Sequence, residues 1–237
     1  MTPSEPDPVR ALAARVRSFT TADRAVRDLR AYFGTGGSSD GAPGTGGPCY
    51  SGGRFERLGG GGDREEIADR FTAEDLIAVQ TLSVKVPAKV ALGLLEGDLG
   101  GELSKLLALI PSDLDMVDAA ASDLAVGSAA DRAWRRLCGE HGVAWVIAGK
   151  LLARKRPRLI PVYDRVVRCA LGRPHAFWPT LHGALRADGG ALHRHLLELR
   201  REAGVPEGVS ALRVCDVAVW MAHRPPGKPR TAYHTCP

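Results

Sequence analysis

Apolar residues recur every three or four positions along most of this chain, which is the spacing of one face of an amphipathic helix. The pattern predicts one or two helices over residues 8–33, with Thr21 as a candidate N-cap and Gly34 as a candidate stop. Residues 34–62 interrupt it and are rich in glycine, which predicts a flexible linker or a lid over a cleft. The chain is therefore expected to begin with an N-terminal helical segment, residues 1–33, followed by a Gly-rich loop.

Helical spacing is continuous after Phe71. Thr72 and Asp75 have the three-residue separation of a capping box, in which each side chain bonds the other residue's backbone amide, so a helix should begin there. Further helices are predicted over residues 87–97, 102–109, 177–187, 191–203 and 210–223.

Together with the helices of the central stretch, residues 131–172, these segments number about nine and leave no convincing strand. The predicted fold class is therefore all-α, a helical bundle with a core over residues 63–223. The last residues, 224–237, contain four prolines and no apolar periodicity. They are expected to form a disordered tail.

The central stretch predicts two helices joined by a tight hairpin. Ala133, Trp134 and Leu137 mark the first helix, whose pattern breaks before Gly142, and a second apolar helix runs over residues 145–153. A glycine in so short a connection lets backbone approach a ligand closely. The first amide groups of the second helix have no partners within that helix, so the hairpin is a candidate phosphate-binding site.

A proline-bounded loop, residues 156–164, follows the hairpin and ends in one carboxylate, Asp164. This order resembles the helix-hairpin-helix motif, the Gly/Pro-rich loop and the catalytic aspartate of the helix-hairpin-helix Gly/Pro/Asp superfamily of base-excision DNA glycosylases. In that superfamily an apolar residue stands three positions after the aspartate and a basic one follows it, as Val167 and Arg168 do here. The 22 positions between Gly142 and Asp164 also resemble the family spacing.

The resemblance implies a two-lobed helical fold with its active cleft between the lobes, and double-stranded DNA as the partner. It implies that Gly142, Val143 and Ala144 hold the phosphate backbone. A target base must leave the duplex before its glycosidic bond can be attacked. Asp164, ionised at a helix start, would then stabilise an oxocarbenium-like centre and position or deprotonate water. Tyr163 is a candidate for stacking on or orienting the base, and Trp145 flanks the hairpin.

The sequence also departs from the family pattern. Ala144 replaces the second glycine of the hairpin, and Val146 stands where lyase-type members carry a lysine, which favours a monofunctional enzyme. Lys150 lies four residues on, on the same helix face, so a lyase variant remains open. Asp164 also fits a purely structural role, as an N-cap or as the ion-pair partner of Arg168.

The net charge is only +5, but its distribution is uneven. Between residues 150 and 173 eight basic residues face one acid, Asp164, and a strip of this kind could neutralise DNA phosphates or be a solvated face. The basic residues are Lys150, Arg154, Lys155, Arg156, Arg158, Arg165, Arg168 and Arg173.

Three readings of the function follow from the sequence. The first is a monofunctional DNA glycosylase; the second is a noncatalytic helix-hairpin-helix DNA-binding protein; the third is a helical protein outside nucleic-acid work. No metal ligand set, cofactor motif or obligate protein partner is evident, and no four-cysteine iron–sulfur loop follows the motif. No apolar run reaches membrane-spanning length and the N-terminus lacks a signal-peptide pattern, so a cytoplasmic protein is expected, nucleoid-associated if it binds DNA.

Overall fold

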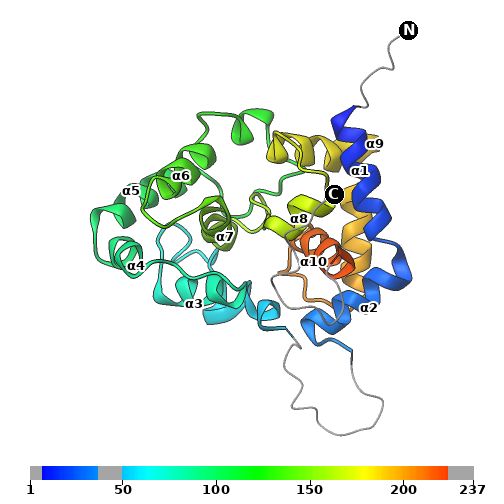
Figure 1. Cartoon of the computed structure of the whole chain (residues 1–237), viewed down its shortest axis with the longest axis horizontal. Coiled ribbons are helices and arrows are strands. Elements are labelled where there is room, and N and C mark those ends of the chain that lie inside the picture. The colour runs from blue at the N-terminus through cyan, green and yellow to red at the C-terminus, as the bar shows by residue number, and fades with distance from the viewer. Residues whose placement is uncertain (1–6, 37–49, 224–237) are drawn as a thin grey trace, which may run out of the picture.

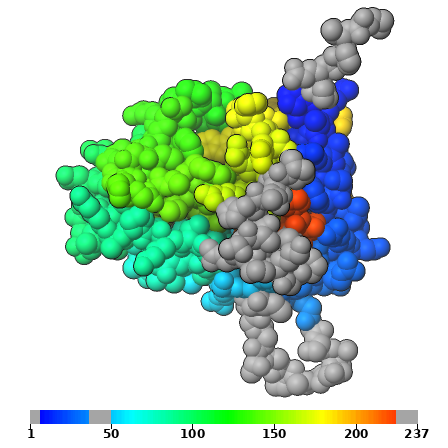
Figure 2. All heavy atoms as spheres, viewed as in Figure 1, coloured from blue at the N-terminus to red at the C-terminus, as the bar shows by residue number. Residues whose placement is uncertain are grey.

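The computed structural model describes residues 7–36 and 50–223, and within these ranges it contains helices and no strand. The predicted all-α class is therefore confirmed. The helices form two groups that adjoin each other in the ribbon view (Figure 1) and form neighbouring halves of the space-filling view (Figure 2).

The first group consists of consecutive helices from the middle of the chain. Helix α4 packs against α5, α5 against α6 and α6 against α7 (Figure 1). Helix α3 also packs against α7. Their bounds are α3 (Ala73–Thr81), α4 (Ala88–Leu95), α5 (Asp98–Leu107), α6 (Ala129–Cys138) and α7 (Trp145–Lys155).

The second group joins the two ends of the described chain. Helix α1 packs against α9 and α10, while α2 packs against the same two helices, so the N-terminal segment shares a core with the C-terminal helices. Helix α8 packs against α10. The bounds are α1 (Pro8–Phe19), α2 (Ala22–Phe33), α8 (Arg165–Ala170), α9 (Phe177–Glu202) and α10 (Ala211–His223).

Short 3₁₀ turns bridge the groups. The turn η1 (Ser51–Arg54) packs against both α2 and α3, and η2 (Leu58–Gly60) packs against α3. Between them Phe55 is only 1% exposed. The later part of the Gly-rich segment is thus anchored in the core, and a third turn, η3 (Ala121–Leu124), contacts α6 and α9.

Local sequence signals explain where several helices begin and end. The capping box at α3 is present, because Asp75 Oδ2 accepts a hydrogen bond from the Thr72 amide at 3.0 Å and Thr72 Oγ1 accepts one from the Asp75 amide at 3.4 Å. Helix α9 is interrupted at residues 187–190, where Asp188, Gly189 and Gly190 have positive φ. The two helices predicted on either side of this break are therefore confirmed.

One boundary prediction was wrong, because α5 begins at Asp98 rather than near residue 102. The predicted tail, residues 224–237, and residues 37–49 of the predicted linker lie outside the described residues. None of the helices within 7–36 and 50–223 has the length and apolar character needed to span a membrane.

Candidate functional site

The predicted hairpin joins α6 to α7. Gly142 is exposed and adopts a φ of +82°, a left-handed conformation that favours glycine. A Cβ at this position would lie 3.0 Å from Cγ of Pro87, so the hairpin rests against the start of α4. Val143 is buried and its amide donates to the Glu140 carbonyl at 3.0 Å. That amide is therefore already occupied, and the expectation that Val143 holds a phosphate was wrong.

The first turn of α7 offers free amide groups instead. Its N-cap is Ala144, an exposed residue whose methyl group cannot accept a hydrogen bond. Within the described parts of the chain, no acceptor meets the amides of Trp145 and Val146. Both residues line the cavity described next, so these N–H groups stand at its edge.

We expect Gly142→Ala to lower the free energy of unfolding by about 1–2 kcal/mol, because a side chain strains the left-handed conformation and crowds Pro87. Gly149→Ala is the matched control within α7, since a Cβ there meets no atom within 4 Å. The control should raise stability by about 0.5–1 kcal/mol, as replacing a helical glycine usually does. Chemical denaturation of both variants measures the difference, and equal effects would contradict this account of the hairpin.

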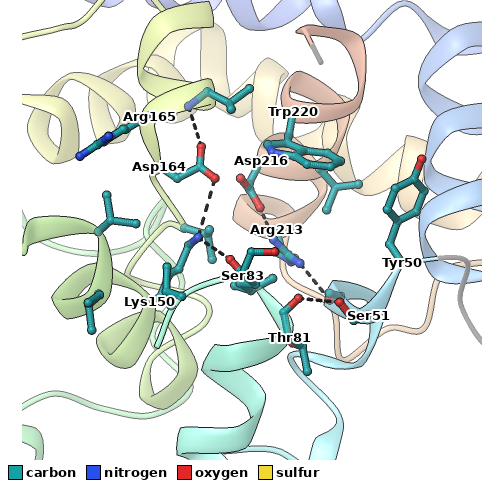
Figure 3. Close-up of a pocket in the computed structure, with 18 of the residues that line it drawn as sticks. Tyr50, Ser51, Thr81, Ser83, Lys150, Asp164, Arg165, Arg213, Asp216 and Trp220 are labelled. Atoms are coloured by element: carbon teal, nitrogen blue, oxygen red, sulfur yellow. Dashed lines mark hydrogen bonds and ion pairs between the residues drawn. The ribbon is translucent and has the colours of Figure 1, made fainter. Parts of the chain in front are cut away.

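A cavity of about 600 Å³ lies between the two helix groups (Figure 3). The first group contributes the end of α3 and the loop after it, residues 81–84, and the first turns of α7. The second contributes α10 and the start of α8, and the segment at residues 50–52 also lines it. The cavity therefore brings together residues more than 160 positions apart in the sequence.

Asp164 occupies the N-cap of α8 and faces this cavity. Its Oδ1 accepts hydrogen bonds from the amides of Val166 at 2.9 Å and Val167 at 3.0 Å. Its Oδ2 lies 3.8 Å from Nζ of Lys150. The carboxylate therefore caps a helix with one oxygen and presents the other toward the cavity (Figure 3). Among the described residues no ion pair joins Asp164 to Arg168.

Lys150 belongs to the cavity and not to a surface strip. Its side chain is 4% exposed, and its Nζ donates a hydrogen bond to the Leu82 carbonyl at 2.9 Å. Burial lowers the pKa of Lys150, and the nearby Asp164 carboxylate opposes that shift. The expectation that Lys150 adds charge for backbone contact is corrected, because its ammonium group points inward.

A second polar cluster, which the sequence did not predict, lies on α10. Arg213 is 4% exposed, and its Nη1 donates to Oδ2 of Asp216. Its Nη2 donates to the Tyr32 hydroxyl at 2.8 Å, and its Nε lies 2.6 Å from Oε1 of Glu56. Both Arg213 and Asp216 line the cavity. Two charged residues three apart in an otherwise apolar helix were the signal that could have found them.

Burial sets the protonation of this cluster. It raises the pKa of Asp216 to about 7, with Arg213 opposing the shift and Asp164 adding to it. It also raises the pKa of Glu56, again against Arg213. The cavity thus contains two aspartates in different surroundings. Asp164 is partly exposed and accepts hydrogen bonds from helix amides, whereas Asp216 is only 5% exposed.

Aromatic rings form another part of the cavity wall. Tyr50 and Trp220 meet edge to face with ring centroids 5.9 Å apart, and Tyr50 stacks on Tyr32 at 5.2 Å. Trp145 lines the cavity as well, near its mouth at the hairpin. A planar ring could lie against such a wall.

Tyr163 does not reach the cavity. Its ring stacks on Phe177 with centroids 3.6 Å apart and an interplanar angle of 12°, and its other neighbour is Trp145 at 5.7 Å. Burial raises the pKa of Tyr163 to about 12, with Arg168 opposing the shift. The expectation that Tyr163 stacks on a base or takes part in catalysis was wrong, because its faces are already covered.

The basic strip is also corrected. Arg154, Lys155 and Arg156 are each at most 1% exposed, so they cannot touch a DNA backbone. Arg154 Nε and Lys155 Nζ bind the two oxygens of Asp75 at 2.8 and 2.9 Å. Arg156 donates to Asp69 at 2.5 Å and to buried carbonyl groups. Through these ion pairs and hydrogen bonds the three cations connect the end of α7 to neighbouring segments.

Other basic residues remain accessible. Arg165 and Arg168 are exposed on α8, and the Arg168 guanidinium lies 5.9 Å from the centre of the Trp145 ring. Arg158 is partly exposed and pairs with Asp115 at 2.8 Å. The sequence analysis missed Lys85 and Lys89, which are exposed on either side of Pro87 and therefore flank the hairpin.

Comparison with known proteins assigns the chain to a family. A family model described as "Family of unknown function (DUF6308)" matches residues 25–223, which begin within α2 and include α3 to α10 and every residue of the cavity. No curated protein and no solved structure matches the chain. Within the described ranges, no group of three or more His, Cys, Asp or Glu residues could hold a metal ion.

Proposed function

The chain belongs to DUF6308, a family of unknown function, and we propose that it is a monofunctional DNA glycosylase that hydrolyses the N-glycosidic bond of a damaged or modified base. The observation that carries the proposal is the position of Asp164. One of its oxygens faces a cavity that the first turn of the hairpin's second helix also borders. A carboxylate and the helix start that we propose to bind phosphate thus border one cavity.

The arrangement of the helices supports the proposal. A two-lobed glycosylase has its active cleft between helical lobes, and here the cavity lies between two helix groups. Lys150 from the first group meets Asp164 from the second across this junction. The volume of about 600 Å³ is within the usual range for a ligand pocket.

Phosphate contact would come from the hairpin and from exposed lysines and arginines around it. Trp145 and Val146 line the cavity and their amides have no acceptor among the described residues, so a phosphate there would complete their hydrogen bonding. Lys85 and Lys89 flank the hairpin, and Arg165 lines the cavity mouth. This surface replaces the buried residues Arg154, Lys155 and Arg156.

The chemistry would follow from base flipping. A base turned out of the duplex would enter the cavity and lie against Tyr50 and Trp220. Its sugar would then be near Asp164, whose Oδ2 lies 3.8 Å from Nζ of Lys150 on the hairpin's second helix. The carboxylate, held in place by two amide hydrogen bonds, would stabilise the positive charge that develops on the sugar and accept a proton from the attacking water.

DNA binding should depend on salt and on the lysines beside the hairpin. We expect each of Lys85→Ala and Lys89→Ala to weaken duplex binding for all sequences alike and to reduce the slope of log K against log salt by about 1. Arg201→Ala, at an exposed position on α9, is the control and should leave the slope unchanged. A duplex affinity that does not change with salt concentration would contradict a DNA-binding role.

The direct test of the proposed function uses end-labelled duplexes that carry alkylated, deaminated or oxidised bases. After incubation with the protein, hot alkali breaks the strand wherever a base has been removed. Alkali-dependent breaks with at least one substrate are expected. Salt-dependent binding without breaks on any substrate would favour a noncatalytic DNA-binding protein, and no binding at all would exclude both.

A bifunctional glycosylase and lyase is the second candidate, because of Lys150. Its Nζ is 3.8 Å from Asp164 Oδ2, and burial lowers its pKa, which increases the fraction of neutral amine available for attack on a sugar carbon. This candidate predicts strand breaks without alkali and a covalent adduct that borohydride traps. Neither product should form with Lys150→Gln.

A further inference from the structure

We propose that Asp216 is the acid that protonates the departing base, so that one carboxyl group of the site gives a proton to the base and the other, Asp164, accepts one from water. This inference rests on the proposed function and names a residue outside the motif that suggested it. Asp216 lies on α10, 52 positions after Asp164.

The geometry places Asp216 on the part of the cavity wall where a base would lie. It lines the same cavity as Asp164 and Lys150. Trp220 follows it by one helical turn, so the two side chains are on one face of α10 (Figure 3). Tyr50 meets Trp220 edge to face at 5.9 Å. A ring held against these aromatic residues would therefore have the Asp216 carboxyl group beside it.

Arg213 orients the Asp216 carboxyl group by a hydrogen bond to one of its two oxygens. The guanidinium donates to Oδ2 of Asp216, while Oδ1 accepts no hydrogen bond from any residue in the described ranges. The same guanidinium also meets Glu56 at 2.6 Å and donates to the Tyr32 hydroxyl. One guanidinium charge thus faces two carboxyl groups, so it can neutralise only one negative charge, and the other carboxyl group can carry a proton.

The groups around Asp216 come from five parts of the chain. Arg213 is on its own helix, Lys150 is on α7 and Asp164 caps α8. Tyr32 of α2 and Glu56, between η1 and η2, both contact Arg213. The two carboxylates disfavour a third negative charge, and Lys150 and Arg213 favour it. Burial decides the balance, because Asp216 is 5% exposed and its pKa rises to about 7.

The step balances with these two groups. The C1′–N bond breaks and its electron pair goes to the base nitrogen, while the carboxylic acid of Asp216 gives its proton to a ring nitrogen or carbonyl oxygen of the same base. Water adds its oxygen to C1′ and its proton passes to the Asp164 carboxylate. The products are a neutral free base and an abasic sugar, and exchange of one proton with solvent restores both aspartates.

The leaving group provides the test. A neutral base needs a proton to leave, whereas an N7-alkylated purine is already cationic and leaves without one. We expect Asp216→Asn to reduce the release of neutral bases by about 10²-fold or more. The release of cationic bases should change less than about threefold, because general acid catalysis contributes nothing there.

The wild-type pH profile gives a second readout that needs no variant. For a neutral base the rate should fall about tenfold per pH unit above pH 7, as the acid form of Asp216 is lost. For a cationic base it should stay flat between pH 6 and 8. This comparison remains valid if Asp216→Asn does not fold.

Each outcome has one meaning. A loss confined to neutral bases supports the acid role. Equal losses on both substrate classes, an unchanged rate on neutral bases, or a wild-type enzyme that releases only cationic bases would overturn it while leaving the glycosylase proposal intact. If the wild-type protein releases no base from any substrate, the proposed function itself fails, and the role of Asp216 fails with it.

Discussion

Asp164→Asn is expected to reduce base release by about 10²- to 10⁴-fold, the range for loss of a group that accepts a proton in the transition state. Asparagine keeps the side-chain oxygen that accepts from the amides of Val166 and Val167, and it is as good an N-cap as aspartate. The substitution removes the negative charge and the base that accepts a proton from water. The rate of abasic-site formation, measured with excess enzyme, reports the loss.

Two accompanying measurements separate chemistry from structure. Duplex affinity should stay within a few-fold of wild type, since Asp164 faces the cavity and is not part of the surface proposed to bind phosphate. The melting temperature should also be retained if the cap is intact. An Asp164→Asn protein that releases the base at the wild-type rate would limit Asp164 to capping α8.

Asp75→Asn is expected to lower the free energy of unfolding by about 3–5 kcal/mol, because it leaves two buried cations without their anion. Asp75 is fully buried, and its oxygens lie 2.8 Å from Arg154 Nε and 2.9 Å from Lys155 Nζ. The same carboxylate completes the capping box of α3. Its loss therefore weakens the contact between α3 and α7 as well as the start of α3.

Asp69→Asn is the matched control for this effect. Asp69 also pairs with a buried arginine, Arg156, but its side chain is 49% exposed, and Arg156 keeps several carbonyl acceptors without it. The expected loss is below about 1 kcal/mol, as for solvent-exposed ion pairs. Urea denaturation of both variants gives the comparison. Similar losses would mean that the buried charges at the end of α7 are stabilised mainly by carbonyl groups.

The fold was predictable wherever a local signal decides it. The capping box at Thr72, the break at Asp188–Gly190 and the turn at Gly142 each depend on a few neighbouring residues, and sequence analysis located all three. Helix existence followed from apolar spacing in the same way. The start of α5 was missed, because Gly100 and Gly101 in its first turns disfavour a helix that tertiary packing nevertheless maintains.

The site was less predictable because its residues meet only after folding. A run of basic residues at 154–156 looks like a solvent-facing strip, and nothing local shows that Asp75, 79 residues earlier, lies inside to neutralise it. Arg213 and Asp216 were overlooked for the complementary reason: their helix reads as core, and their partners Glu56 and Tyr32 are distant in sequence. Asp164 was identified because it stands at the aspartate position of the motif, and Lys150 because it lies four residues after the position of the lyase-type lysine.

The arrangement of charge explains why the cavity can persist in a buried position. Lys150 links the two helix groups through Leu82 and Asp164, and Arg213 gathers Tyr32, Glu56 and Asp216 on the opposite side. Burying an unpaired charge is costly, and both buried cations have carboxylate, hydroxyl or carbonyl partners. On the proposed function, these contacts would hold the site in place before a substrate enters and so reduce the reorganisation that catalysis requires.

The most direct test of the central claim does not require the lesion to be guessed. Pooled duplex DNA that has been alkylated, deaminated and oxidised is incubated with wild-type protein or with Asp164→Asn, and the free bases in the supernatant are identified by mass spectrometry. The account predicts that at least one modified base is released by the wild-type protein and is absent with Asp164→Asn. Wild-type protein that binds this DNA and releases no base would contradict it.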